Sequence, residues 1–270
     1  MPLLHSPVDG TPLHYDMTGE GPVLVLLHGS VLTRAIWRGL GYLDLLAAQR
    51  TVVRVDLRGH GSSGKPHEAN AYSQEVLVAD LLALLDALDA PQADLMGYSL
   101  GARIAVTAAV SHPSRVRRVV SLGGSAADQR EAIDTVFFPG TIQCLREQGM
   151  AAFCDRQSLT ADTDNPRARA TREVFLRADP LAIAALFEAT EATGAISDEQ
   201  LAACEVPVLW MAGSEDQPRC SESRHAAALM PQGRFVELPG RTHGSTLSPA
   251  GPVLREALPF LMQGTPEYTG

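Results

Sequence analysis

One stretch, residues 93–105, constrains the fold of this chain more than any other. A short apolar run leads into Gly-Tyr-Ser-Leu-Gly at positions 97–101, and an alanine-rich apolar segment follows. This order predicts a buried strand, a tight turn and the start of a helix, because Gly97 and Gly101 lack the Cβ atoms that would clash where strand and helix pass closely. Ser99 would then lie on a strained turn with its hydroxyl exposed above the sheet. The alternative is a turn whose small residues serve packing alone.

Short apolar runs alternate with segments of helical spacing along most of the chain. Besides the strand before Ser99, the runs cover residues 22–27, 51–56, 116–122, 206–213 and 233–238, and helical spacing covers 35–48, 73–88, 221–230 and 252–262. The runs are too short for most helices and suit strands that are buried on both faces of a parallel sheet. Residues 11–16 predict one strand of an opening hairpin. The alternation predicts an α/β fold with a doubly wound, mostly parallel sheet.

Residues 126–203 differ from the rest of the chain. Strand-like runs are absent there, and alanine, arginine and acidic residues recur at helical spacing. We expect helices over 128–136, 139–157, 166–177, 179–193 and 198–203. An all-helical insertion after a sheet strand predicts a cap, which divides the chain into an α/β core (1–125 and 204–270) and a helical cap (126–203). The tail 263–270 is expected to fray.

Composition excludes several classes of partner. The net charge of −9 and the pI near 5.3 leave no attractive field for nucleic acid or an anionic membrane surface. The first residues lack the charged and apolar regions of a secretory leader, and no apolar run approaches the length that spans a bilayer. The four cysteines have no Cys-x-x-Cys spacing, which predicts free thiols and a cytoplasmic protein. We expect no metal or organic cofactor, a small-molecule substrate as the partner, and a monomer or homodimer.

A serine nucleophile needs a base within hydrogen-bond reach, and the base needs an acid to orient it. Of the eight histidines, His28, His60 and His243 follow predicted strands. Ligands bind beyond the carboxyl ends of the strands in sheets of this kind, so these three are the candidates. The order nucleophile, acid, histidine along the chain favours His243 as the base.

The acid should follow a strand that lies between Ser99 and His243 in the sequence. Asp216 follows the predicted strand 206–213 and is favoured, because a short carboxylate on a turn can orient Nδ1 of an imidazole. Glu215 beside it and Asp128 after the strand 116–122 are the alternatives.

A tetrahedral oxyanion needs at least two hydrogen-bond donors. The backbone amide of Leu100, at the start of the helix after Ser99, is expected to be one of them. The amide of Ser30 is expected to be the second, since it lies in the turn after the strand 22–27. Gly29 lets the backbone approach closely there.

Two arginines have unusual positions. Arg54 lies within a predicted buried strand, where a guanidinium requires partners, so we expect a nearby carboxylate. Arg241 lies two residues before His243 and either reaches toward the entrance of the site or lies solvated on the surface.

Taken together, the motifs resemble the α/β-hydrolase fold family, in its serine-nucleophile, esterase- or lactonase-like branch with a helical cap. The matching stretches are 26–30, 55–63, 97–101, 112–116, 212–216 and 242–244. The resemblance implies a catalytic triad of Ser99, Asp216 and His243, with an oxyanion hole from the amides of Ser30 and Leu100. It also implies that residues 56–63 form a structural turn, which removes His60 from the candidates for the base. Serine at position 99 argues against the family's epoxide hydrolases and dehalogenases, which carry aspartate there.

These residues imply a serine hydrolase that cleaves a small-to-medium, largely apolar carboxylic ester or lactone through an acyl-enzyme. We expect Tyr98, Phe137 and Phe138 to contact the substrate, while other phenylalanines of the predicted cap pack its helices together. The same triad would also serve a C–C bond hydrolase, a perhydrolase-like enzyme or a thioesterase. From a different class, a non-catalytic ligand-binding member of the fold is the remaining alternative.

Overall fold

The computed structural model describes residues 2–263, and its eight strands form one sheet in the order β1-β2-β4-β3-β5-β6-β7-β8. The strands β1 (Leu3–His5) and β2 (Pro12–Thr18) form the expected antiparallel hairpin, and β2 is also antiparallel to β4. Six strands are parallel to one another: β3 (Val23–Leu27), β4 (Thr51–Val55), β5 (Ala93–Tyr98), β6 (Val116–Leu122), β7 (Val208–Gly213) and β8 (Gly233–Leu238). The predicted α/β fold is therefore confirmed. Apart from Gln263, the tail that was expected to fray lies outside the described residues.

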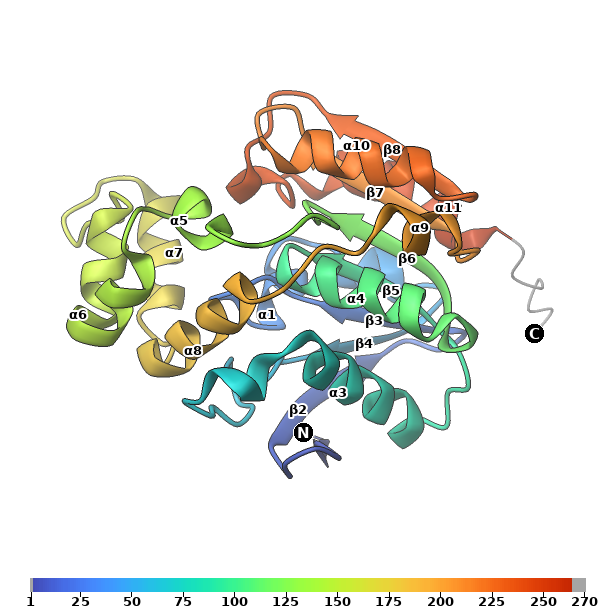
Figure 1. Ribbon diagram of the computed structural model, residues 1–270, viewed down its shortest axis with the longest axis horizontal. Coiled ribbons are helices and arrows are strands. Elements are labelled where there is room, and N and C mark those ends of the chain that lie inside the picture. Colours follow the sequence, from blue (N-terminus) through green and yellow to red (C-terminus); the bar gives the residue numbers. More distant parts are fainter. Residues whose placement is uncertain (1, 264–270) are drawn as a thin grey trace.

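Side chains of the parallel strands alternate between two hydrophobic clusters, one on each face of the sheet. On β3, for example, Val25 and Leu27 belong to one cluster and Leu24 and Leu26 to the other. This alternation follows from the two-residue period of a strand. The helices α3 (Gln74–Ala87), α4 (Leu100–Ser111) and α10 (Arg219–Leu229) cover the first face, and α1 (Ala35–Gly39), α2 (Leu43–Ala47) and α11 (Ala250–Met262) cover the second. The sheet is thus wound on both faces (Figure 1).

The strand β3 lies between β4 and β5, so the chain crosses the sheet in opposite directions before and after β4. Because the connections after β3 and β5 leave in opposite directions, a crevice forms between the carboxyl ends of these two strands. The loop after β3 and the turn after β5 meet at this point. The topology therefore brings the neighbourhoods of Ser30 and Ser99 together.

The expected helix over residues 35–48 is two short helices, which corrects the prediction. The helix α1 ends at Gly39, α2 begins at Leu43, and Gly41 between them has a φ of 80°. That left-handed conformation is accessible to glycine and ends a helix. Apolar spacing continued across the break because both helices bury the same face: Trp37 and Leu46 lie in one cluster.

Five helices lie between β6 and β7, over the range predicted as the cap. They are α5 (Ala132–Val136), α6 (Thr141–Arg156), α7 (Pro166–Phe175), α8 (Pro180–Glu191) and α9 (Asp198–Ala202). Figure 1 shows α5 to α8 grouped to the left of the sheet, beyond the ends of its strands. Phe153 of α6 packs against the rings of Phe137, Phe138 and Phe175. The division of the chain into a core and a cap stays a prediction.

The two linkers that lead into and out of these helices run side by side. The amide of Ile196 donates to the carbonyl of Ala126 (2.8 Å), and the amide of Gln129 donates to that of Thr193 (3.0 Å). The buried guanidinium of Arg103, one turn into α4, donates to three carbonyl oxygens, those of Ser125, Ala127 and Gly194. Both linkers are thereby fixed to the helix that follows Ser99.

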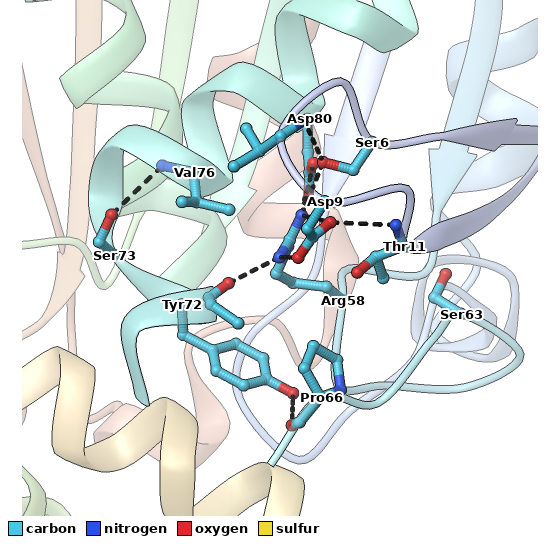
Figure 2. A network of polar contacts seen from close by, with 12 residues as sticks. Ser6, Asp9, Thr11, Arg58, Ser63, Pro66, Tyr72, Ser73, Val76 and Asp80 are labelled. Atoms are coloured by element: carbon cyan, nitrogen blue, oxygen red, sulfur yellow. Dashed lines mark hydrogen bonds and ion pairs between the residues drawn. The ribbon is translucent and has the colours of Figure 1, made fainter. Parts of the chain in front are cut away.

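Arg58, in the loop after β4, joins four parts of the chain (Figure 2). Its guanidinium forms two hydrogen bonds with Asp80 of α3 (2.6 and 2.8 Å) and further bonds with Asp9 (2.9 Å), Ser6 Oγ (2.8 Å) and the carbonyl of Ala71 (2.7 Å). The side chain is fully buried. A buried cation with several oxygen partners anchors the opening hairpin to the sheet and to α3.

Two further expectations concern buried polar side chains. Arg54 on β4 pairs with Asp16 on the neighbouring β2 at 2.7 Å, so the expected carboxylate partner is confirmed. Each of the four cysteines is a buried free thiol: Cys144, Cys154, Cys204 and Cys220.

Candidate active site

Ser99 lies on the sharp turn between β5 and α4. Its backbone has a φ of 52° and a ψ of −112°, an unusual conformation for a residue with a side chain, and its amide donates to the carbonyl of Leu122 on β6 (2.9 Å). A Cβ atom on Gly97 would overlap the carbonyl of Gly101, and one on Gly101 would overlap that of Leu27. The two glycines are therefore required by the close approach of strand and helix.

His243 and Asp216 meet Ser99 at the carboxyl ends of the strands. The Oγ atom of Ser99 lies 3.0 Å from Nε2 of His243, and Nδ1 of His243 lies 2.8 Å from Oδ2 of Asp216. The structure thus brings the three predicted residues into one hydrogen-bonded chain. Glu215 is exposed and donates its amide to the carbonyl of Arg241, and Asp128 pairs with Arg130, so neither alternative acid takes this place.

The surroundings of His243 favour its neutral form. Burial lowers the pKa of the imidazole below its ordinary value of 6.5, and the hydrogen bond that its Nδ1 donates to Asp216 opposes this effect. Asp216 itself is almost fully buried, with its carboxylate facing the imidazole. A neutral imidazole next to a serine hydroxyl is the state that can accept a proton.

Gly123 is a residue of the site that sequence reasoning missed. It follows β6 directly, and its φ is 56°. A Cβ atom there would lie 3.3 Å from Nδ1 of His243, which is tighter than ordinary contact, and 3.4 Å from Oδ2 of Asp216. The only signal in the sequence was a Gly-Gly pair at the end of a predicted strand.

The loop that carries His243 is fixed from both sides. Tyr98 donates its hydroxyl to the carbonyl of His243 (2.8 Å), and its ring stacks on the imidazole at a centroid distance of 5.4 Å. Arg241 is buried and donates to the carbonyls of Thr246 and Pro249 (both 2.7 Å). Both expectations for Arg241, at the site entrance or in solvent, were wrong, because the arginine holds its own loop. Tyr98 contacts the base, and its predicted contact with substrate stays a prediction.

The two predicted oxyanion donors lie on either side of Ser99. A Cβ atom on Gly29 would lie 2.8 Å from the ring of Tyr98 and 3.4 Å from Cβ of Ser99, so the loop after β3 passes directly beside the turn. Leu100 is the first residue of α4. Within residues 2–263, the amides of Ser30 and Leu100 donate no hydrogen bond to another protein group. Both are therefore available to a ligand.

Phe137 and Phe138 lie between α5 and α6 and are half-buried. Phe137 contacts Phe153 and Phe187, and the guanidinium of Arg156 lies over the ring of Phe138. These rings pack within the helical segment, and their role in substrate binding stays a prediction.

In the described part of the chain, no group of histidine, cysteine or acidic side chains is arranged to hold a metal ion. None of the helices within residues 2–263 is long and apolar enough to cross a membrane. A pocket of about 480 Å³ opens between α3, α4 and the linker after α8, and its walls do not include Ser99, His243 or Asp216.

Several known proteins are similar to this chain. A family model described as the alpha/beta hydrolase fold matches residues 22–243. The pimeloyl-[acyl-carrier protein] methyl ester esterase of Edwardsiella ictaluri is 30% identical over 239 residues, which are 83% of this chain and 87% of that protein. The enol-lactonase from Burkholderia xenovorans LB400 is 28% identical, with a TM-score of 0.82 over 96% of this chain and 99% of that one.

Another relative matches a shorter stretch more closely. The 2-hydroxymuconate semialdehyde hydrolase of Pseudomonas sp. (strain CF600) is 39% identical over 125 residues, which are 44% of this chain and 43% of that protein. The matched stretch of this chain therefore spans less than half the length of that relative.

Proposed function

Since this chain belongs to the α/β-hydrolase fold family, we propose that it is a serine hydrolase of small-to-medium, largely apolar carboxylic esters or lactones. The observation that carries the proposal is the unbroken hydrogen-bonded chain from Ser99 through His243 to Asp216. This chain of hydrogen bonds supports the proposal because a hydroxyl, an imidazole and a buried carboxylate in that order can carry out nucleophilic catalysis.

The proposed reaction begins when Nε2 of His243 takes the proton of Ser99 as Oγ attacks the substrate carbonyl carbon. The carbonyl electron pair moves onto oxygen, where the amides of Ser30 and Leu100 stabilise the negative charge. Collapse of this intermediate expels the leaving group, which takes the proton from His243, and leaves an acyl ester on Ser99. Water that His243 deprotonates then attacks the acyl carbon. The acyl–Oγ bond breaks, the carboxylic acid leaves, and His243 returns the proton to Oγ of Ser99. Asp216 orients the imidazole and stabilises its protonated form.

Two similarities support an ester or lactone as the substrate. A relative that matches 83% of this chain is named as a methyl ester esterase, and a similar solved structure is named as an enol-lactonase. Phe137 and Phe138, which are half-buried between α5 and α6, are the apolar side chains that we expect to contact a largely apolar acyl group.

One specific observation favours a second candidate, a C–C bond hydrolase. The 39% identical relative acts, by its name, on a hydroxymuconate semialdehyde, which is neither an ester nor a lactone. A vinylogous oxo acid of this kind would be cleaved at a carbon–carbon bond by the same serine, histidine and aspartate.

A substrate panel separates these candidates. We expect the purified protein to hydrolyse p-nitrophenyl acetate and butyrate or an aliphatic lactone with a higher kcat/KM than thioesters or vinylogous diketones. Preferred cleavage of the diketones would favour the C–C bond hydrolase. No turnover on the whole panel, together with no labelling by an alkyl phosphonate, would refute the proposal and favour a ligand-binding role.

The pH dependence of kcat/KM provides a test of the base. His243 must be neutral to accept the proton of Ser99, and burial lowers its pKa below 6.5. Activity should therefore rise with pH through a single ionisation centred below pH 6.5 and stay level above it, because kcat/KM reports the ionisations of the free enzyme. The measurement is a profile of kcat/KM for p-nitrophenyl butyrate at constant ionic strength, with the fold monitored by circular dichroism. A limb centred above pH 6.5 would contradict this assignment.

A further inference from the structure

Two histidines that the proposed reaction does not use connect the loops after β3 and β4. His28 follows β3, and its Nε2 accepts the amide of Leu57 in the loop after β4 (3.1 Å). His60 lies in the loop after β4, and its Nε2 accepts the amide of Val31 in the loop after β3 (3.1 Å). The rings contact edge to face at 4.9 Å, and both are almost fully buried. Each loop thus supplies a histidine to the backbone of the other.

These contacts define the protonation of both rings. An Nε2 atom that accepts a backbone N–H carries no proton, so the proton of each ring lies on Nδ1. Nδ1 of His28 then donates to the carbonyl of Gly29 (2.8 Å), and Nδ1 of His60 donates to that of Arg58 (2.9 Å). Burial lowers the pKa of His28 to about 4 and that of His60 to about 3. Burial therefore favours the neutral form of both rings.

The histidine bonds act on the two peptide groups that flank Ser30. The carbonyl of Gly29 and the amide of Ser30 belong to one planar peptide group, so a bond that directs the carbonyl also directs the amide. Nδ1 of His28 supplies that bond, and the amide of Leu32 donates to the same carbonyl (3.3 Å). The next peptide group contains the amide of Val31, which donates a hydrogen bond to Nε2 of His60.

The backbone at Val31 needs this support. Val31 is buried, is branched at Cβ and has a φ of 63°. Such residues rarely adopt the left-handed region, and the conformation persists only where the surroundings hold it. Asp56 holds the far end of the loop, where it accepts the amide of Arg34 (2.8 Å).

We propose that His28 and His60 are positioning residues that aim the Ser30 amide at the oxyanion. The proposal rests on the proposed function, because it assigns Ser30 as an oxyanion donor. It gives the turn 56–63 a part in the reaction through the backbone of Val31, in addition to the structural part that the family resemblance implied.

Two substitutions of His60 test the proposal. His60→Met removes the acceptor for the Val31 amide at similar volume, whereas His60→Gln can place a carbonyl oxygen near the position of Nε2. His225→Met serves as the control, since the side chain of His225 is exposed and its ion-pair partner, Asp198, belongs to neither the loop after β3 nor the loop after β4. We expect kcat of His60→Met to fall at least about tenfold, and by less than the roughly thousandfold that loss of one donor can bring. KM should change little, and His60→Gln should recover part of the activity.

A transition-state analogue distinguishes positioning from a merely structural role. Butylboronic acid forms a tetrahedral adduct with a nucleophilic serine, so its inhibition constant should rise by the same factor as kcat/KM falls across the series. A lower melting temperature with unchanged kcat/KM and inhibition constant would overturn the proposal. So would a loss of activity that lies wholly in KM.

The wild-type protein provides a measurement that does not depend on variants that fold. Two-bond ¹H–¹⁵N correlation spectra of protein with ¹⁵N-labelled histidine should show His60 with its proton on Nδ1 and an unprotonated Nε2. A proton on Nε2 would overturn the proposal. Failure of the proposed function appears separately, as absence of turnover and of phosphonate labelling in the wild-type protein.

Discussion

Replacement of Ser99 with alanine is expected to reduce kcat on the order of a millionfold. The hydroxyl of Ser99 is the group that lies 3.0 Å from Nε2 of His243, so the variant has a base without a nucleophile to activate. Only stabilisation of the oxyanion and substrate binding would then remain. The measurements are initial rates on the best ester of the panel and covalent labelling by a fluorescent alkyl phosphonate, which should disappear in the variant.

The variant should fold like the wild-type protein, because the amide of residue 99 still donates to the carbonyl of Leu122. Ser111→Ala is a matched control: Ser111 lies at the other end of α4, is exposed and donates to the carbonyl of Thr107 within its own helix. It should leave both rate and labelling unchanged. Turnover of Ser99→Ala at more than a few per cent of wild type, or persistent labelling, would place the nucleophile elsewhere.

Replacement of Arg58 with alanine is expected to lower the free energy of unfolding by about 3–5 kcal/mol. The substitution removes the cation from a fully buried position and leaves Asp80, which is almost fully buried, without its two hydrogen bonds. The carbonyl of Ala71 loses a donor as well. Equilibrium unfolding in urea measures the effect as a lower midpoint with an unchanged slope.

Two further variants show whether the burial of charge is the cause. Arg234→Ala breaks an ion pair between two partly exposed side chains, Arg234 and Glu256, and should change stability by less than about 0.5 kcal/mol. The double variant Arg58→Met/Asp80→Leu should be less destabilised than Arg58→Ala, because it also removes the buried Asp80 carboxylate. Asp9 loses Arg58 in both variants, but its side chain is partly exposed to water. A change of less than about 1 kcal/mol for Arg58→Ala would show that the network in Figure 2 contributes little.

The turn at Ser99 could be predicted because its causes are local. Gly97 and Gly101 are needed by contacts with residues close in the sequence or on the adjacent strand, and the apolar runs on both sides identify a strand and a helix. His243 and Asp216 could be predicted because each follows a strand in an order that the chain itself displays.

Other features depend on contacts that a single sequence does not display. Helical spacing reports which face of a segment is buried, and this face stays the same across the break at Gly41. Arg241 donates to backbone carbonyls of its own loop. Every residue type carries such a carbonyl, so the sequence does not identify these partners. The acceptors for the amides of Leu57 and Val31 are histidines 29 residues away in each case. A separation of 29 residues indicates a contact only when β3 and β4 are known to be neighbouring strands.

The paired linkers between β6 and β7 bear on how chains of this kind can diversify. The two strands are neighbours in the sheet. The hydrogen bonds of Ala126 with Ile196 and of Gln129 with Thr193 join the two ends of the helical segment between them. Beyond these bonds, each doubling of inserted length costs only about 0.6 kcal/mol in closure entropy. Helices there can lengthen, shorten or be exchanged between lineages while Ser99, His243 and Asp216 keep their places. The helices predicted to contact the substrate can therefore change without displacing these three residues.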